Sequence, residues 1–235
     1  MVSVGGPAPD RPPAPLLSAQ SVARRYGRIV ALAPTDLDIR AGDSLALIGP
    51  NGAGKSTLLS ILAGALRATD GRLAVAANHG PPPKIGWVPQ RPAQYGRLTA
   101  RENLELFARL ERVKDPEAAA ERLLRLVEVP ADDRATCDLS AGNQQRLNLA
   151  VSLLAQPDVL LLDEPTASLD PRQRRRFWEV AAKVHQGGGA VVFATQNLEE
   201  LERFANRVAV LLEGKLVFDG TVEQFSRAPE ADVFS

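Results

Sequence analysis

Apolar and polar positions follow two alternating patterns along the chain from Leu16 onward. Short continuous apolar runs are typical of strands buried on both faces, and the clearest are Ser44–Ile48, Val159–Leu162 and Ala190–Ala194. Amphipathic segments of helix length lie between them. This alternation predicts an α/β fold in which helices pack on a parallel sheet.

The end of the pattern predicts a helix stop and a hairpin. The triple glycine Gly187–Gly189 follows an amphipathic segment and would end that helix before the apolar run at Ala190. Further on, Val208–Leu212 and Lys215–Phe218 flank a Glu-Gly pair, which is typical of two antiparallel strands joined by a tight turn.

A long stretch between Gln90 and Ser140 contains no convincing strand. Thr99 and Glu102 form a capping box at a helix start. The apolar residues that follow at helical spacing are Leu104, Phe107, Leu110 and Val113. A second helix begins near Pro116, with Leu123, Leu124 and Val127 on one face. We expect a helical subdomain, about residues 91–157, inserted in the α/β core.

Composition narrows the class of protein. The chain has 235 residues with 28 basic and 28 acidic side chains, and this balance gives no basic surplus for nucleic acid. The apolar share of 45% is that of a globular protein, and no apolar run approaches the ~20 residues of a membrane span.

The proline-rich segment Met1–Pro15 is predicted to be a disordered leader, with residues 16–235 as a single domain. The single cysteine, Cys137, excludes an internal disulfide and fits either a reducing compartment or a small buried apolar position.

The most informative segment matches the pattern G-x-x-x-x-G-K-[ST] between a predicted strand and a predicted helix. Its residues are Gly49, Pro50, Asn51, Gly52, Ala53, Gly54, Lys55, Ser56 and Thr57. Glycines let backbone N–H groups converge on a phosphate, and the helix N-terminus adds its positive end. Lys55 would place a cation near the β and γ phosphates, and Ser56 would bind Mg²⁺.

Two acidic residues end the predicted strand Val159–Leu162. Ligands of parallel sheets bind at the carboxyl ends of the strands, so Asp163 is predicted to help hold the magnesium ion. Glu164, the next residue, is placed to polarise an attacking water as a general base.

These motifs, with three others in order, resemble the nucleotide-binding subunit of the ATP-binding cassette (ABC) superfamily. Val88–Gln90 resembles the Q-loop, Leu139–Asn143 resembles the LSGGQ signature, and Ser168–Asp170 resembles the D-loop. The likeness extends from Leu16 to about Phe225. It implies a P-loop NTPase core of ABC type, with an N-terminal antiparallel β subdomain and an inserted helical subdomain.

The resemblance also assigns roles to single residues. Tyr26 lies where the family stacks an aromatic ring on adenine, although it could also be an ordinary hairpin aromatic. Gln90 would contact the metal ion and the attacking water and signal to the helical insert. Ser140 and Gly142 would bind the γ-phosphate of ATP held by a second subunit, and Asp170 would belong to the same nucleotide interface. The implied ligands are ATP and Mg²⁺, and the implied assembly is a head-to-tail pair around two ATP molecules.

The chain departs from the family pattern at several positions. Ala141 replaces a glycine and Asn143 a frequent glutamine, a mild change because Ser140 and Gly142 remain. More seriously, Gln196 occupies the position of a histidine that reaches the γ-phosphate. A neutral amide can donate a hydrogen bond but cannot become a cation, so slow turnover is expected. The two histidines, predicted to be surface residues, are His79 and His185.

The leading hypothesis is an ATPase motor subunit that drives a separate membrane permease from the cytoplasmic face, with a second cassette that is the same chain or a paralogue. The segment Tyr95–Leu104 resembles exporter-type subunits, whereas Asn143–Gln145 resembles sugar importers, so the direction stays open. One alternative is a nucleotide-dependent dimerisation switch with little turnover, and another is a soluble ABC ATPase of repair or translation. The arginines between Arg172 and Arg176 are predicted to form the solvated face of a helix or, less simply, a contact with charged lipid.

Overall fold

The computed structural model describes residues 14–75 and 81–229 of the chain. The predicted leader lies outside these residues except for Ala14 and Pro15, and so does His79. The strands are β1 (Leu17–Tyr26), β2 (Ile29–Ile39), β3 (Ser44–Ile48), β4 (Asp70–Val75), β5 (Ile85–Val88), β6 (Val159–Asp163), β7 (Ala190–Ala194), β8 (Arg207–Leu212) and β9 (Lys215–Thr221). The helices are α1 (Lys55–Leu62), α2 (Ala100–Leu110), α3 (Pro116–Val127), the 3₁₀ turn η1 (Thr136–Asp138), α4 (Ala141–Ser152), α5 (Pro171–Gln186), α6 (Leu198–Phe204) and α7 (Val222–Phe225).

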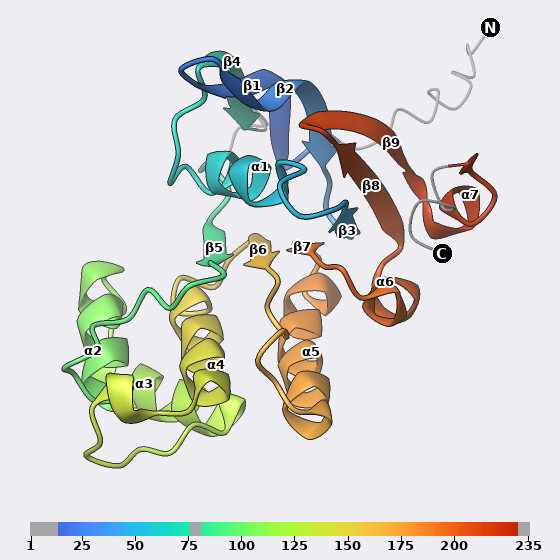
Figure 1. Ribbon diagram of the computed structural model, residues 1–235. Coiled ribbons are helices and arrows are strands. Elements are labelled where there is room, and N and C mark those ends of the chain that lie inside the picture. Colours follow the sequence, from blue (N-terminus) through green and yellow to red (C-terminus); the bar gives the residue numbers. More distant parts are fainter. Residues whose placement is uncertain (1–13, 76–80, 230–235) are drawn as a thin grey trace, which may run out of the picture.

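A six-stranded sheet forms the centre of the molecule (Figure 1). Its strand order is β5-β6-β7-β3-β8-β9, and every neighbouring pair is parallel except the β8–β9 hairpin. Strands β3, β6 and β7 are buried along their whole length, as continuous apolar runs require. The predicted parallel sheet and the C-terminal hairpin are therefore confirmed.

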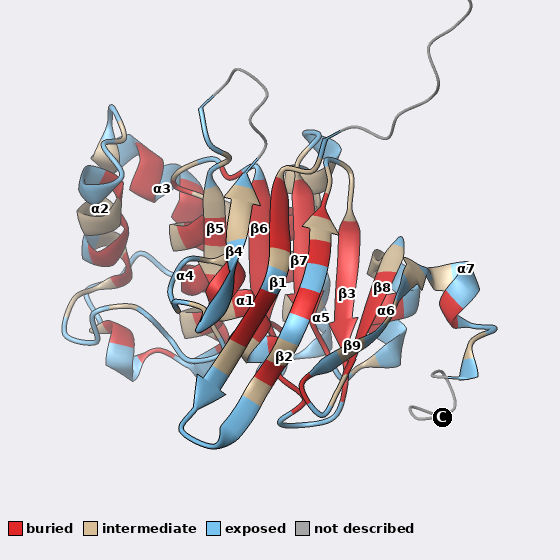
Figure 2. Cartoon of the chain, turned by 90° about the horizontal axis from the view of Figure 1, so that it is seen from above, coloured by how far each residue is buried: buried red, intermediate tan, exposed pale blue. Residues whose placement is uncertain are grey.

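A smaller antiparallel sheet covers one side of the central sheet (Figure 2). Its order is β2-β1-β4, and α1 lies between it and the central sheet (Figure 1). Apolar side chains of β1, β2, β3 and α1 form one continuous core there. Burial of this face of α1 fixes the helix, and with it the loop that precedes the helix.

The helices on the opposite side of the central sheet enclose a second core. Trp178 of α5 stacks on Phe204 at a ring-centroid distance of 4.5 Å and meets Phe193 of β7 edge-on at 4.7 Å. Helices α2, α3 and α4 lie between β5 and β6 in sequence, and residues 89–158 contain no strand. No helix in the described part of the chain is long and apolar enough to cross a bilayer.

Several local predictions are confirmed by the backbone. Thr99 and Glu102 form both hydrogen bonds of a capping box. The predicted strands at Ser44 and Ala190 have the expected bounds. The structure also shows Asp170 as the N-cap of α5, with Pro171 in the first turn of the helix.

Other predictions are wrong. The first helix of the insert ends at Leu110, which is 65% exposed, and Val113 lies beyond the helix because Arg112 turns the chain with a φ of 56°. Cys137 is exposed and not a small buried residue, because the buried position of its turn is taken by Thr136.

The basic segment at the start of α5 is only partly solvated. Arg175 is exposed, whereas Arg174 and Arg176 are half-buried, with Arg176 paired to Glu128 at 3.3 Å. His185, expected at the surface, is also half-buried in the last turn of this helix. Helix α5 therefore packs over a wider face than its apolar stripe predicts.

Candidate active site

The phosphate-loop motif forms the turn between β3 and α1, and two of its glycines have no room for a side chain. A Cβ atom on Gly49 would lie 2.2 Å from the carbonyl oxygen of Leu211, and one on Gly54 would lie 2.7 Å from that of Ala31. Gly54 also has a φ of 102°, in the region that favours glycine. The loop is thus pressed against β2 and β8, which fixes its curvature.

Lys55 begins α1 and points back into the loop. Its Nζ donates hydrogen bonds to the carbonyl oxygens of Gly49 at 2.7 Å and Pro50 at 3.0 Å. Burial lowers the pKa of this ammonium group, while the nearby Glu164 and Asp163 act in the opposite direction. The loop therefore places a cation beside a helix N-terminus, an arrangement suited to a phosphate group.

Ser56 and Asp163 lie together at the edge of the loop. The Ser56 Oγ donates to Asp163 Oδ1 at 3.0 Å, and Asp163 is only 3% exposed at the end of β6. Burial raises the pKa of Asp163, opposed by the Ser56 hydrogen bond and by Lys55. In residues 14–75 and 81–229 no three His, Cys, Asp or Glu residues gather into a metal site. One hydroxyl and one carboxylate fit Mg²⁺, which binds through few protein oxygens and shares substrate phosphates.

Glu164 lies at the centre of a network of amide side chains. Its Oε2 accepts from Gln90 Nε2 at 3.0 Å, and its Oε1 accepts from Gln196 Nε2 at 2.8 Å. Gln196 Nε2 also lies 2.7 Å from Asn51 Oδ1 in the phosphate loop. Because these residues follow β5, β6, β7 and β3, the network joins four neighbouring strand ends at the carboxyl edge of the sheet.

The loop after Gln90 is connected to α4 by residues that sequence reasoning missed. The Ala93 amide donates to Asn148 Oδ1 at 3.2 Å, and Gln94 Nε2 donates to the carbonyl oxygen of Gln144 at 2.5 Å. In the sequence, Asn148 is a polar residue among the apolar residues Leu147, Leu149 and Ala150, and this was the signal that could have identified it. These contacts connect the loop that follows Gln90 to the helical insert.

The signature residues lie at the start of α4 and face α5. Ser140 caps α4 by accepting from the Asn143 amide, and a Cβ atom on Gly142 would lie 2.5 Å from Gln173 Oε1. In the described part of the chain neither residue hydrogen-bonds to the phosphate loop. Asn143 instead accepts from Arg146 at 2.5 Å, so this departure from the family pattern forms an internal contact.

Tyr26 ends β1 with its side chain 49% exposed. The Arg24 guanidinium lies 4.4 Å from the ring centroid, so one face of the ring is covered by a cation. The ring is accessible for stacking, as the adenine assignment requires.

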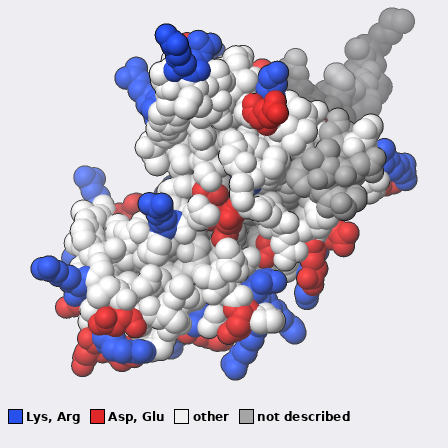
Figure 3. Space-filling view, viewed as in Figure 1, with Lys and Arg blue, Asp and Glu red and all other residues white. Residues whose placement is uncertain are grey.

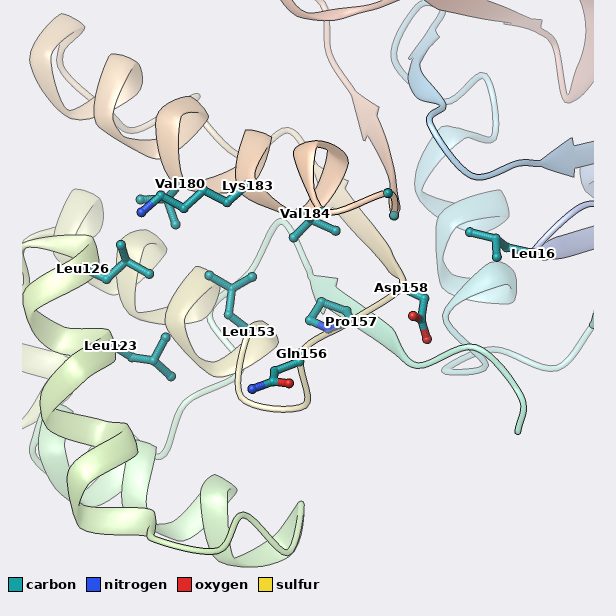
Figure 4. Close-up of a pocket in the computed structure, with 13 residues that line it drawn as sticks. Leu16, Leu123, Leu126, Leu153, Gln156, Pro157, Asp158, Val180, Lys183 and Val184 are labelled. Carbon is teal, nitrogen blue, oxygen red and sulfur yellow. The ribbon is translucent and has the colours of Figure 1, made fainter. Parts of the chain in front are cut away.

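The structure has one cleft beside the Glu164 network and one pocket away from it. A cleft of about 680 Å³ is lined by Glu164, Gln196 and neighbouring residues of the loops after β6 and β7. A more apolar pocket of about 420 Å³ lies between α3, the end of α4 and α5, and its lining includes Leu123, Leu153 and Val180 (Figure 4). This second pocket contains none of the predicted site residues.

Charges are mixed over the surface. On the face shown in Figure 3, basic and acidic side chains are interspersed, consistent with the equal numbers of each in the chain.

Comparison with known proteins identifies the family. The family model described as ABC transporter matches residues 32–167. A daunorubicin resistance ATP-binding protein of Streptomyces coeruleorubidus is 35% identical over 225 residues, covering 92% of this chain and 71% of that protein. A sulfate/thiosulfate import ATP-binding protein of Caulobacter vibrioides is 35% identical over 227 residues, covering 91% of this chain and 67% of that protein. A solved dimeric ATP-binding cassette bound to ADP and Pi has a TM-score of 0.78 at 26% identity, covering 88% of this chain and 98% of its own. The chain therefore belongs to the ABC transporter family and has its P-loop cassette fold.

Proposed function

We propose that this chain is the ATP-hydrolysing subunit of an exporter-type ABC transporter and drives a separate membrane permease from its cytoplasmic face. The observation that supports it most is the position of Glu164, hydrogen-bonded by amides on both oxygens and adjacent in sequence to Asp163. The drug-resistance name of one relative favours export, while the import name of another is the competing direction.

The phosphate loop and its neighbours would bind the nucleotide. Lys55 and the N-terminus of α1 attract the phosphates, and the Tyr26 ring stacks on the base with Arg24 behind it. Ser56 and Asp163 would hold Mg²⁺, which when bound neutralises phosphate charge and orients the terminal phosphate.

Hydrolysis would depend on Glu164. Its carboxylate accepts a proton from the attacking water, and the Gln90 and Gln196 amides hold its oxygens in place. Gln196 stays neutral where the family has a histidine, so it orients without supplying positive charge, and turnover is slow for that reason.

A complete site would need a second cassette. Ser140, Gly142 and Asp170 would face ATP bound by the phosphate loop of the other subunit, and ATP would join the pair. The contacts from the Gln90 loop to α4 would pass the nucleotide state to the helical insert and the permease.

The test is MgATP hydrolysis and equilibrium nucleotide affinity of the full chain beside Gln196→His. We expect measurable turnover in the unmodified chain and faster turnover in Gln196→His at unchanged affinity. Tight binding with no hydrolysis by either protein, even with a partner cassette, would instead establish a nucleotide-dependent clamp.

A further inference from the structure

A buried carboxylate outside the proposed chemistry lies behind the active site. Glu200 of α6 is only 2% exposed. A buried carboxylate is costly unless hydrogen bonds compensate for the water it has lost. The hydrogen-bond partners of Glu200 therefore indicate which parts of the fold this carboxylate holds together.

The partners of Glu200 come from three separate segments. Its Oε2 accepts from the Thr195 hydroxyl at 2.8 Å, and its Oε1 accepts from the Thr166 hydroxyl and from Trp178 Nε1 at 3.4 Å. Arg174 Nε lies 3.8 Å from the same Oε1. Both threonines and Trp178 are buried, so water does not replace these donors.

The two threonines belong to the loops that contain the proposed hydrolytic pair. Thr195 immediately precedes Gln196, and Thr166 follows Glu164 by two residues. The side chains of the two loops are thus joined by the exposed Gln196–Glu164 contact at 2.8 Å and also by the buried carboxylate of Glu200. Trp178 and Arg174 tie the same carboxylate to α5.

We propose that Glu200 is a positioning residue that sets the spacing of the loops after β6 and β7 and so keeps Gln196 in contact with Glu164. The inference rests on the proposed function for its consequence in turnover. The cleft beside the pair is lined by Thr166, Arg174 and Thr195 as well as by Glu164 and Gln196, so a shift of either loop changes its shape.

Glu200→Gln is the sharpest variant because it keeps the size of the side chain. The amide has one acceptor oxygen where the carboxylate has two, so one threonine hydroxyl loses its acceptor. Thr195→Val removes the link on one side alone, and Thr195→Ser restores the hydroxyl. Glu202→Gln, an exposed position on the same helix, is the matched control.

The experiment measures kcat and KM for MgATP with the full chain, together with the melting temperature of each variant. In Glu200→Gln and Thr195→Val we expect kcat to fall about 10- to 100-fold, because small misplacements of reacting groups have effects of this size. KM should change less than about twofold, and Thr195→Ser and Glu202→Gln should keep normal turnover. Unchanged kcat in folded Glu200→Gln overturns the inference.

A double-mutant cycle separates positioning from general support of the fold. If Glu200 acts through the Gln196–Glu164 contact, Glu200→Gln should change kcat less than about twofold when Gln196 is already alanine. The same fold-loss in both backgrounds overturns the proposal.

Hydrogen exchange tests the inference without turnover. The Glu164 amide donates to the Ala194 carbonyl at 3.1 Å, and the Thr195 amide donates to that of Leu47 at 3.3 Å. Both amides should exchange faster in Thr195→Val and normally in Thr195→Ser, and equal exchange in the two variants contradicts the proposal. If the unmodified chain does not hydrolyse ATP, the proposed function fails, while this exchange result still decides the role of Glu200.

Discussion

The proposed role of Asp163 in binding Mg²⁺ is opposed by its effect on the stability of the fold. The carboxylate is buried at the end of β6, where desolvation raises its pKa above the ordinary value of 3.8. The fold thus favours the protonated form, and this contribution to stability is lost as the pH rises through the raised pKa. At neutral pH this buried acid therefore lowers the stability of the fold, a cost that fits its proposed role in binding a cation.

Asp163→Asn should stabilise the chain at neutral pH while weakening magnesium-dependent nucleotide binding. Without nucleotide and in EDTA, we expect the melting temperature at pH 7 to rise by about 2–4 °C. The difference should shrink as the pH falls through the raised pKa of the folded state, and it should be largely lost below 3.8, where the carboxyl is protonated in both the folded and the unfolded chain. Asp70→Asn, at an exposed position on β4, should change the melting temperature by less than about 1 °C. A lower melting temperature for Asp163→Asn at pH 7 would contradict the assigned cause.

Gly49 and Gly52 make a matched pair within the phosphate loop. Alanine at Gly49 would bring Cβ to 2.2 Å from a backbone oxygen, whereas alanine at Gly52, with a φ of 79°, meets nothing within 4 Å. We expect Gly49→Ala to lower the free energy of unfolding by roughly 3 kcal/mol or more and Gly52→Ala by about 1 kcal/mol. Urea unfolding measures the free energy of unfolding of both variants. Equal losses would contradict this prediction, because they would show that the backbone near β8 moves away from an added Cβ atom at little energetic cost.

At the scale of elements, the strands that were predicted most accurately from the sequence are those whose residues are all buried. β3 and β7 were found with their bounds because every residue in them is apolar or buried. β1 was not found, because it bulges near Ser21, which has a φ of 49°, and its alternation is broken there. Helix α6 has only 7 residues, so the apolar spacing of Leu198, Leu201 and Phe204 is too short to predict a helix from the sequence, and Glu200 on it was not found.

Some contacts of the candidate site could likewise be predicted from the sequence, and others could not. The phosphate loop, Asp163 and Glu164 are adjacent in sequence to predicted strands, so their meeting at one sheet edge follows from topology. The Gln196–Asn51 contact joins residues 145 positions apart and depends on the strand order, which local patterns do not specify.

Arg146 fixes the signature helix to its neighbour. The buried guanidinium of this α4 residue donates to the carbonyl oxygens of Val127 and Glu128, both at 2.7 Å, and so caps the end of α3. Arg146→Met should lower the free energy of unfolding by roughly 2–4 kcal/mol, since two carbonyls lose a charged donor. Arg125→Met, exposed near the same end of α3, should stay within about 0.5 kcal/mol of the wild type in urea unfolding. Similar losses in both variants would contradict this role.

At the scale of the whole molecule, the phosphate loop and the signature residues lie on different elements and make no hydrogen bond to each other in the described chain. A second cassette is expected to bring them together. Light scattering of Glu164→Gln should give twice the chain mass of 25.2 kDa with MgATP and a single chain mass with ADP. Ser140→Arg should prevent the association, because its bulk and charge would occupy the proposed interface. A single chain mass under all conditions would contradict ATP-dependent pairing.

The most direct test of the account is phosphate release from saturating MgATP by the unmodified chain and by Glu164→Gln, with nucleotide affinity measured on the same samples. We expect release to fall by about 10²- to 10⁴-fold in the variant at unchanged affinity, because the carboxylate that accepts the proton is lost while the phosphate loop is intact. Glu111→Gln, an exposed residue beyond α2, should hydrolyse normally. Turnover by Glu164→Gln at the unmodified rate would contradict the assignment of Glu164 as the general base.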